Sequence, residues 1–283
     1  MEFDKHFQEL KSKVDSYVRT FLNGLENSSN ELGNFNLLEA ITYSAQEGGM
    51  RLRPILSLLT AEALGKSPEL VLPFGCAVEL IHSYSLIHDD LPCMDNDDFR
   101  RGKLANHKMF GEGLAVLAGD ALITEAFSLL TREYKDKPDL ALGLISDLAK
   151  AAGARGMVGG QAADLSLRAG GWTRAQLESL HKMKTGALIK VSVMAAAKIC
   201  GVDEEQSRQL EKYADALGLL YQFADDIGDN NDAEPSIVKL VGLDEAKLIS
   251  KNLFVRAKQA IETWGSSAQG LRDLVNYVIE RTH

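Results

Sequence analysis

Basic charge is scarce in this sequence, which has 31 lysines and arginines against 40 aspartates and glutamates and a net charge of −9. A nucleic-acid-binding protein normally presents a basic face, so the excess of acid argues against that class. Aromatic residues make up only 7% of the chain, which leaves few rings for stacking on bases. We therefore expect no nucleic-acid partner.

Cysteines and long apolar runs are scarce as well. The three cysteines, Cys76, Cys93 and Cys200, are odd in number and far apart, so they predict neither a disulfide framework nor a zinc site and fit a reducing compartment. The N-terminal stretch carries acids and does not resemble a signal peptide. No stretch contains the ~20 consecutive apolar residues of a membrane span. We therefore expect a cytoplasmic protein with no membrane span.

What the sequence does contain is helical periodicity along most of its length. Apolar residues between Phe3 and Phe21 recur at intervals of three and four, which predicts an amphipathic first helix. Pro68 and Pro138 suit the first turns of helices and Gly201 suits a helix end. No segment has the pattern of a strand. The same periodicity predicts helices over residues 37–45, 52–64, 69–91, 113–132, 138–157, 173–200, 204–229, 243–263 and 268–280.

No linker rich in glycine, serine or proline divides the chain, so we predict a single domain over residues 1–283. The segments 69–91 and 185–200 are apolar around most of their circumference, which is typical of helices surrounded by other helices. The predicted architecture is an all-α bundle of about ten or more helices around a central cavity.

Two acidic clusters follow apolar segments. The first, "HDDLPCMDNDDFRRGK" (residues 88–103), has five aspartates within ten positions and then two arginines and a lysine. The second, "YQFADDIGDNND" (residues 221–232), places Asp225 and Asp229 on one helix face, where like charges repel unless a cation lies near. Carboxylates without accompanying His or Cys ligands favour a hard cation such as Mg²⁺, which often shares its ligands with phosphate oxygens. The spacing of a calcium-binding EF-hand is absent.

Several basic residues stand beside glycines or at predicted helix ends. They include Arg51 and Arg53 in "GGMRLRP" and Lys184 in "KTG". Arginine forks match phosphate geometry, and glycines let backbone N–H groups approach an anion. His82 precedes Asp89 by seven residues and so lies on the same helix face. Each of these residues alone is more often an ordinary surface or core residue, but together with the aspartate clusters they indicate a site for phosphate groups.

Five motifs of this chain resemble, in order, those of the trans-isoprenyl diphosphate synthases. They are "GGMRLRP", "IHSYSLIHDDLPCMDNDDFRRGK", "GGQAADL", "KTGALI" and "YQFADDIGD". The resemblance runs from about Ala45 to Ala246 and is nearest to the bacterial branch that forms farnesyl diphosphate (geranyltranstransferases). It implies an enzyme, a homodimer, that joins isopentenyl diphosphate head-to-tail to dimethylallyl or geranyl diphosphate with the help of magnesium.

The resemblance also implies roles for individual residues. Three Mg²⁺ ions would be held, two by Asp89 and Asp95 and the third by Asp225 with support from Asp229. The allylic diphosphate would contact Arg100, Lys184, Thr185 and Gln222, and isopentenyl diphosphate would contact Arg53, His82 and Arg101. Tyr84, five residues before Asp89, would close the hydrophobic tunnel and favour a C15 product.

The chain departs from the pattern of that family at three places. Met50 stands where the family has a lysine that contacts isopentenyl diphosphate, the segment after Asp232 is short, and Glu234 replaces another lysine. Alternatives therefore remain: a synthase of geranyl or geranylgeranyl diphosphate, or a non-catalytic regulatory subunit of such a synthase. A terpene cyclase, also helical with aspartate motifs, would have no use for "GGMRLRP" or the Arg-Arg pair.

Overall fold

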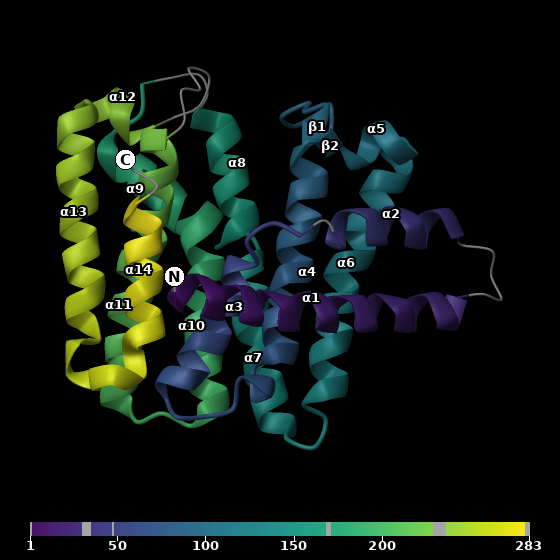
Figure 1. The fold of residues 1–283 in the computed structure, drawn as a ribbon. Coiled ribbons are helices and arrows are strands. Elements are labelled where there is room, and N and C mark those ends of the chain that lie inside the picture. Colours follow the sequence, from purple (N-terminus) through teal and green to yellow (C-terminus); the bar gives the residue numbers. More distant parts are fainter. Residues whose placement is uncertain (1, 30–34, 47, 168–170, 229–235, 281–283) are drawn as a thin grey trace. The chain divides into compact units, whose positions relative to one another are not determined.

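The computed structural model describes residues 2–29, 35–46, 48–167, 171–228 and 236–280. Helices occupy nearly all of them, which confirms the predicted all-α class (Figure 1). The α-helices are α1 (Glu2–Ser29), α2 (Phe35–Ala45), α3 (Leu52–Ala63), α4 (Leu72–Asp89), α5 (Asn106–Phe110), α6 (Glu112–Glu133), α7 (Pro138–Ala152), α8 (Met157–Leu167), α9 (Arg174–His181), α10 (Ala187–Cys200), α11 (Glu204–Gly228), α12 (Ile237–Val241), α13 (Leu243–Ala260) and α14 (Gln269–Glu280).

Three shorter helical segments have other geometries. The turns η1 (Pro68–Leu70) and η3 (Glu262–Ala268) are 3₁₀ helices, and η2 (Lys182–Gly186) is a π-helix between α9 and α10. Sequence periodicity merged α9, η2 and α10 into one helix over residues 173–200. It missed α5, α8 and α12 as separate helices, because short helices show too few turns to define a period.

The absence of strands was a wrong prediction. Strands β1 (Phe99–Arg100) and β2 (Lys103–Leu104) form an antiparallel hairpin, joined by Arg101 and Gly102, both with positive φ (52° and 80°). Two positive φ values in a two-residue loop define the turn type whose twist suits a hairpin. Strands of two residues have no alternation to detect, so the pattern could not reveal them.

Several predicted helix boundaries are confirmed by their local geometry. Pro68 starts η1 and Pro138 starts α7, where a missing N–H costs no hydrogen bond. Gly201 adopts the left-handed conformation at the end of α10. The Asp203 carboxylate accepts a hydrogen bond from the Gln206 N–H (2.8 Å), which caps α11.

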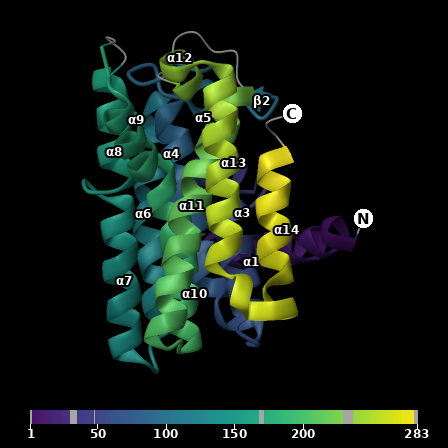
Figure 2. The same ribbon diagram turned by 90° about the vertical axis from the view of Figure 1, so that its left-hand side faces the viewer.

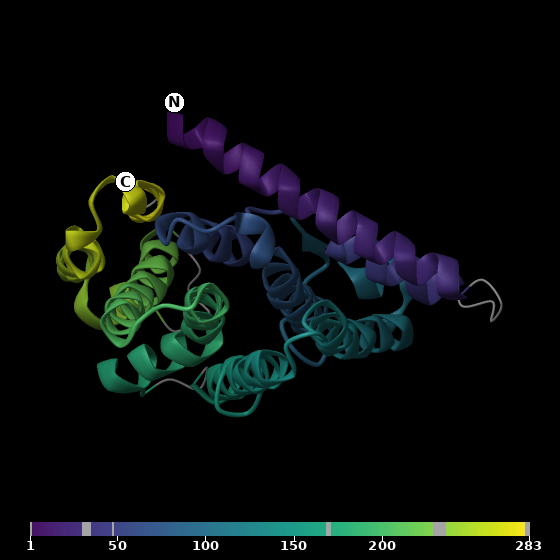
Figure 3. The same cartoon turned by 90° about the horizontal axis from the view of Figure 1, so that it is seen from below.

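Contacts within the chain group it into two compact units, so the predicted single domain stays a prediction. The first unit comprises residues 1–55 and 72–145. In it, α4 packs against α1, α2 and α6, and thirteen of its residues are buried. Figure 3 shows α1 running alongside α2. The nearly all-round burial of α4 confirms the expectation for residues 69–91.

The second unit comprises residues 56–71 and 146–283. Its long helix α11 packs against α10, α13 and α14, as the view in Figure 2 shows. The buried Tyr213 hydroxyl of α11 donates to the Leu271 carbonyl of α14 (2.9 Å), and Ser57 of α3 donates to the Ser192 carbonyl of α10 (2.9 Å). These bonds satisfy buried polar groups that would otherwise destabilise the core.

One described helix contradicts the expectation that no segment is apolar enough to span a membrane. Helix α6 passes that test by length and composition, with a mean hydropathy of 1.6 over 18 residues, of which 39% are buried. Core helices of soluble proteins pass the same test, so the observation is weak evidence for a span. What it does show is an apolar helix with an exposed face, on which Val116 and Leu117 are 40% and 53% exposed.

Candidate functional site

The first aspartate cluster lies at the C-terminal end of α4. Asp89 is the last residue of this helix, and its carbonyl accepts a hydrogen bond from the Asp95 N–H (2.8 Å). This bond folds residues 89–95 into a tight loop, so the chain brings Asp89 and Asp95 back to the same helix end. The loop therefore places both predicted metal ligands together within the first unit.

Asp90 has a different role from its neighbour Asp89. Its carboxylate is 2% exposed and accepts a hydrogen bond from the Arg100 Nε (2.9 Å). Arg100 also reaches Asp97 (3.2 Å). Burial opposes the positive charge of Arg100, but the hydrogen bond and charge of Asp90 outweigh it and raise the pKa of the guanidinium. The Arg100–Asp90 ion pair therefore connects hairpin β1–β2 to the residue that follows α4.

Three basic residues predicted to hold the second diphosphate lie close together. Burial, and then the charges of Arg53 and Arg101, lower the pKa of His82 well below 6.5. The Arg101 guanidinium lies against the backbone at Gly49, where an added Cβ would be 2.5 Å from Cζ. The lowered pKa favours the neutral imidazole of His82 near pH 7, while the arginines carry the charge.

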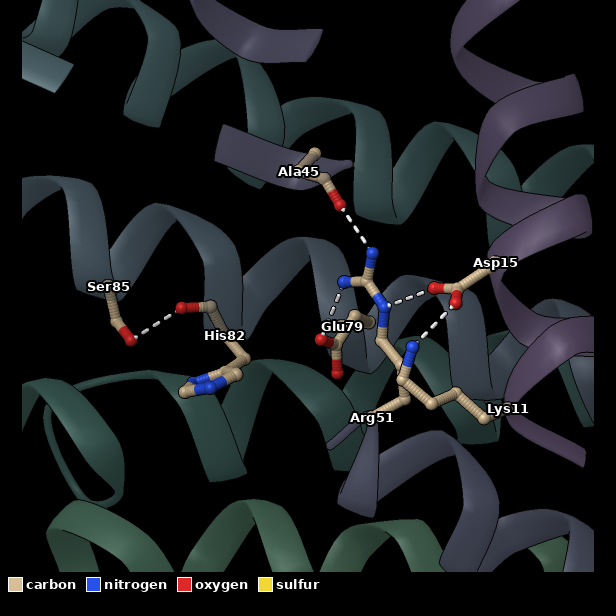
Figure 4. A network of polar contacts seen from close by, with 7 residues as sticks. All are labelled: Lys11, Asp15, Ala45, Arg51, Glu79, His82 and Ser85. Carbon is tan, nitrogen blue, oxygen red and sulfur yellow. Dashed lines mark hydrogen bonds and ion pairs between the residues drawn. The ribbon is translucent and has the colours of Figure 1, made fainter. Parts of the chain in front are cut away.

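The sequence grouped Arg51 with Arg53 as a residue suited to phosphate, although the resemblance assigned a ligand to Arg53 alone. The structure gives Arg51 a structural role. Figure 4 shows its guanidinium between three partners on three segments of the chain. It donates to Glu79 Oε1 (2.9 Å), Asp15 Oδ1 (2.8 Å) and the Ala45 carbonyl (2.8 Å). Its side chain is only 1% exposed. Arg51 therefore ties α1, α2 and α4 together and has no surface left for a ligand.

Tyr84 lies on α4 one turn below the aspartate loop. The residue is 5% exposed, and its ring makes an edge-on contact with the His88 ring (centroids 5.7 Å apart). Burial, and then the charge of Asp89, raise the pKa of Tyr84 to about 12. The His88 Nε2 in turn lies 3.1 Å from the Val116 carbonyl oxygen of α6. Gly119 leaves room for this ring, because a Cβ at Gly119 would be 2.1 Å from the His88 Nε2. The predicted role of Tyr84 in product length stays a prediction.

The second unit carries the remaining predicted residues. Asp225 lies in the last turn of α11, and Asp229 lies outside the described residues. Thr185 of η2 donates a hydrogen bond to Gln222 Oε1 of α11 (2.7 Å). The structure therefore brings Thr185 and Gln222 together beside Asp225, as their shared predicted role requires.

Lys184 is also held within this unit. Its Nζ lies 2.8 Å from Asp164 Oδ2 of α8, and its side chain is 26% exposed. Gly160 allows this approach, because a Cβ there would be 2.3 Å from the Lys184 backbone nitrogen. The motif "GGQAADL" thus supplies the close helix contact and the carboxylate partner. π-helical turns occur frequently at functional sites, which agrees with the position of Lys184 and Thr185 in η2.

The described residues contain no group of three or more His, Cys, Asp or Glu side chains arranged to hold a metal by themselves. Mg²⁺ does not need such a cage, because it usually keeps several waters and takes one or two carboxylates together with substrate phosphates. Asp89 and Asp95 on one loop fit that donor set.

Comparisons with known proteins agree with this chemistry. The polyprenyl synthetase family model matches residues 35–263. The chain belongs to the polyprenyl synthetase family. A farnesyl diphosphate synthase from Geobacillus stearothermophilus is 47% identical over 248 residues, which cover 87% of this chain and 82% of that protein. Geranylgeranyl pyrophosphate synthase 7 from Arabidopsis thaliana is 39% identical over 86% of this chain and 76% of its own.

A solved structure is similar to nearly all of this chain. An FPP/GFPP synthase from Zymomonas mobilis, determined without ligand, superposes with a TM-score of 0.91 at 36% sequence identity. The match covers 98% of this chain and 99% of that one. Membership of the polyprenyl synthetases therefore confirms the resemblance stated from the motifs.

Proposed function

We propose that this protein is a prenyltransferase that joins isopentenyl diphosphate head-to-tail to dimethylallyl and then geranyl diphosphate, giving farnesyl diphosphate. The observation that carries the proposal is the 47% identity to a farnesyl diphosphate synthase over 87% of the chain. The grouping of Arg53, His82 and Arg101 within one unit supports it, since this cluster offers two cations and a neutral donor to a diphosphate.

Asp89, Asp95, Asp225 and Asp229 would hold magnesium, which we propose as three ions per site. When bound, magnesium supplies positive charge that neutralises the diphosphate and makes it a better leaving group. Lys184 and Arg100 would stabilise the negative charge that grows on the leaving diphosphate, and Thr185 and Gln222 would orient it. Arg53, His82 and Arg101 would hold isopentenyl diphosphate with its double bond toward the allylic carbon.

No side chain of the described site needs to act as the base. The double bond of isopentenyl diphosphate attacks the allylic cation, and the proton lost from the adduct goes to the departing diphosphate. His82 suits binding rather than proton uptake, because its lowered pKa makes the imidazole a weak base.

A second candidate product is geranylgeranyl diphosphate. The 39% identity to geranylgeranyl pyrophosphate synthase 7 over 86% of this chain supports it. Tyr84 favours the shorter product, because its buried ring occupies volume below the aspartate loop.

We also propose that the protein is a homodimer in the cytoplasm. The exposed apolar face of α6, with Val116 and Leu117, supports association with a second copy, because exposed apolar surface is stabilised by burial. Cys76, Cys93 and Cys200 are all free thiols, which agrees with a reducing compartment.

The deciding experiment incubates the protein with isopentenyl diphosphate and, separately, dimethylallyl, geranyl or farnesyl diphosphate in the presence of Mg²⁺. Mass spectrometry of the dephosphorylated products gives their chain length. We expect a C15 product, no turnover in EDTA, and a loss of several orders of magnitude in Asp89→Ala. Asp98→Ala is the matched control, because Asp98 lies in the same acidic stretch but pairs with Lys108 (2.7 Å). Absence of any condensation by the wild type would refute the proposal.

A further inference from the structure

A buried chain of polar contacts joins four elements of the second unit at the end of α11. Its centre is the Asp226 carboxylate, which is 8% exposed. Asp226 Oδ1 accepts a hydrogen bond from Gln222 Nε2 (3.2 Å), and Oδ2 accepts one from the Ile237 N–H (2.7 Å). His181 Nε2 is buried and lies 3.3 Å from the same Oδ2, although it makes no hydrogen bond with the described residues. None of the roles assigned to the site so far uses His181 or Asp226.

The chemistry of the carboxylate fixes the orientation of the Gln222 amide. An ionised carboxylate only accepts hydrogen bonds, so the NH₂ group of Gln222 must face Asp226. The amide oxygen then faces the other way and accepts the proton of the Thr185 hydroxyl (2.7 Å). Thr185 has one hydroxyl proton, so its direction is fixed as well. Asp226 thereby sets the hydrogen-bond direction of two residues proposed to contact the allylic diphosphate.

His181 connects this chain to the backbone that carries Lys184. It is the last residue of α9, is 3% exposed, and immediately precedes the π-helix η2. Its ring also packs edge-on against Phe223 of α11 (centroids 5.7 Å apart). The contact of His181 with Phe223 therefore holds the residue that directly precedes η2 against α11.

Asp226 also holds the first turn of α12. The Ile237 N–H is among the backbone groups at a helix start that have no partner within the helix. Asp226 of α11 accepts a hydrogen bond from this Ile237 N–H. The Ser236 hydroxyl oxygen accepts one from the following N–H, that of Val238 (3.2 Å). One buried carboxylate thus binds α11 to the start of α12 while it orients Gln222.

We propose that His181 and Asp226 are positioning residues for the allylic diphosphate site: they fix Gln222, Thr185 and the η2 backbone without touching substrate themselves. The proposal rests on the proposed prenyltransferase function. It predicts a selective effect. Loss of either residue weakens use of the allylic substrate and leaves use of isopentenyl diphosphate unchanged, because Gln222, Thr185 and Lys184 of η2 are all assigned to the allylic diphosphate.

The test uses the full chain with two near-isosteric variants. His181→Phe keeps a ring against Phe223 but loses the nitrogen beside Asp226. Asp226→Asn keeps an acceptor for the Ile237 N–H but presents an NH₂ group to Gln222. The matched control is Asp215→Asn, since Asp215 is a carboxylate on the same helix that pairs with Lys190 (3.0 Å) and is 52% exposed.

Two readouts are measured for each variant. The first is KM for geranyl diphosphate and for isopentenyl diphosphate at saturating Mg²⁺. The second is the Kd of geranyl S-thiolodiphosphate, which does not ionise readily, by calorimetry. We expect a rise of about tenfold or more in the allylic KM and Kd for both variants, since small misplacements of orienting groups have effects of this size or larger. The KM for isopentenyl diphosphate should stay within about twofold, and Asp215→Asn should match the wild type.

Several results would overturn the proposal. If the wild type condenses the substrates but both variants keep the wild-type allylic KM and Kd, the pair is structural only. Equal increases for both substrates would contradict a selective positioning role. A wild type that condenses nothing refutes the proposed function instead, so the two failures are distinguishable.

The assigned hydrogen-bond direction has its own test. Gln222→Glu alone sets two carboxylates against each other and should lower the melting temperature. Adding Asp226→Asn restores a donor opposite the new carboxylate, so the double variant should melt above the single one. A double variant no more stable than Gln222→Glu would show that Gln222 does not donate to Asp226.

Discussion

Replacement of Arg51 tests whether this arginine is a structural residue rather than a substrate ligand. Arg51→Met keeps most of the side-chain volume and leaves the Glu79 carboxylate, itself 3% exposed, without its cation. The second oxygen of Glu79 already lacks a hydrogen bond among the described residues. Breaking a buried ion pair from one side costs about 3–5 kcal/mol, because an uncompensated charge stays buried. The variant should therefore be strongly destabilised.

The expected size follows from the length of the chain. For proteins of this size or somewhat smaller, each kcal/mol lowers the melting temperature by about 2–3 °C, so Arg51→Met should lower it by roughly 6–15 °C. Thermal unfolding followed by circular dichroism measures this shift. Arg51 adopts a positive φ of 51°, but methionine suffers the same backbone strain, so the strain does not contribute to the difference.

Two further variants separate the contributions to this network. Asp15→Asn should lower the melting temperature by only about 2–4 °C, because Asp15 is 27% exposed and water screens the lost charge. The double variant Arg51→Met/Glu79→Leu should recover more than half of the loss, since it removes both charges together. An Arg51→Met protein with the wild-type melting temperature and a raised KM for isopentenyl diphosphate would refute the structural role.

Three other predictions concern the substrate sites and the surface. Tyr84→Ala should shift the product from C15 toward C20, because it opens room where burial of each added methylene contributes about 0.8 kcal/mol. Tyr84→Phe is the control, and an unchanged C15 product in Tyr84→Ala would contradict the prediction. Met50→Lys should lower the KM for isopentenyl diphosphate by adding a charge-assisted contact, whereas an equal or higher KM would show that the site works without this cation. Leu117→Glu should convert a dimer to a monomer, as measured by light scattering, while the control Leu248→Glu, also at an exposed leucine, should stay dimeric. A dimeric Leu117→Glu protein would exclude the apolar face of α6 as the dimer interface.

The fold could be predicted well from the sequence where helices are long. Periodicity located α4, α6, α11 and α13 to within a few residues, because each repeats its apolar face over four or more turns. It failed at hairpin β1–β2 and at η2. The hairpin depends on Arg101 and Gly102 adopting positive φ, and η2 depends on packing against α8 at Gly160. Both are determined by local geometry and tertiary contact, which periodicity does not record.

The sequence motifs could identify residues of the candidate site but not the contacts that these residues and their neighbours make. The motifs identified Asp89, Asp95 and His82. The structure places Asp89 and Asp95 on one loop, and their roles and that of His82 stay predictions. They did not reveal that His181 and Asp226 form a buried pair, although both stand within or beside quoted motifs. A histidine three residues before Lys184 and a second aspartate after Asp225 carry no pattern of their own. Only the fold brings them within reach of each other.

The exposure of a cation, rather than its ion pairing, decides whether a basic residue of a motif is available to a ligand. Arg51, Arg100 and Lys184 each pair with a buried carboxylate, so pairing alone does not separate structural from binding residues. Exposure does. The Arg51 side chain is 1% exposed, whereas those of Arg100 and Lys184 are 32% and 26% exposed and can meet an incoming diphosphate while their stems stay held. A carboxylate behind a partly exposed cation fixes its position and lowers the entropy lost on binding, so pairing and ligand binding support each other there.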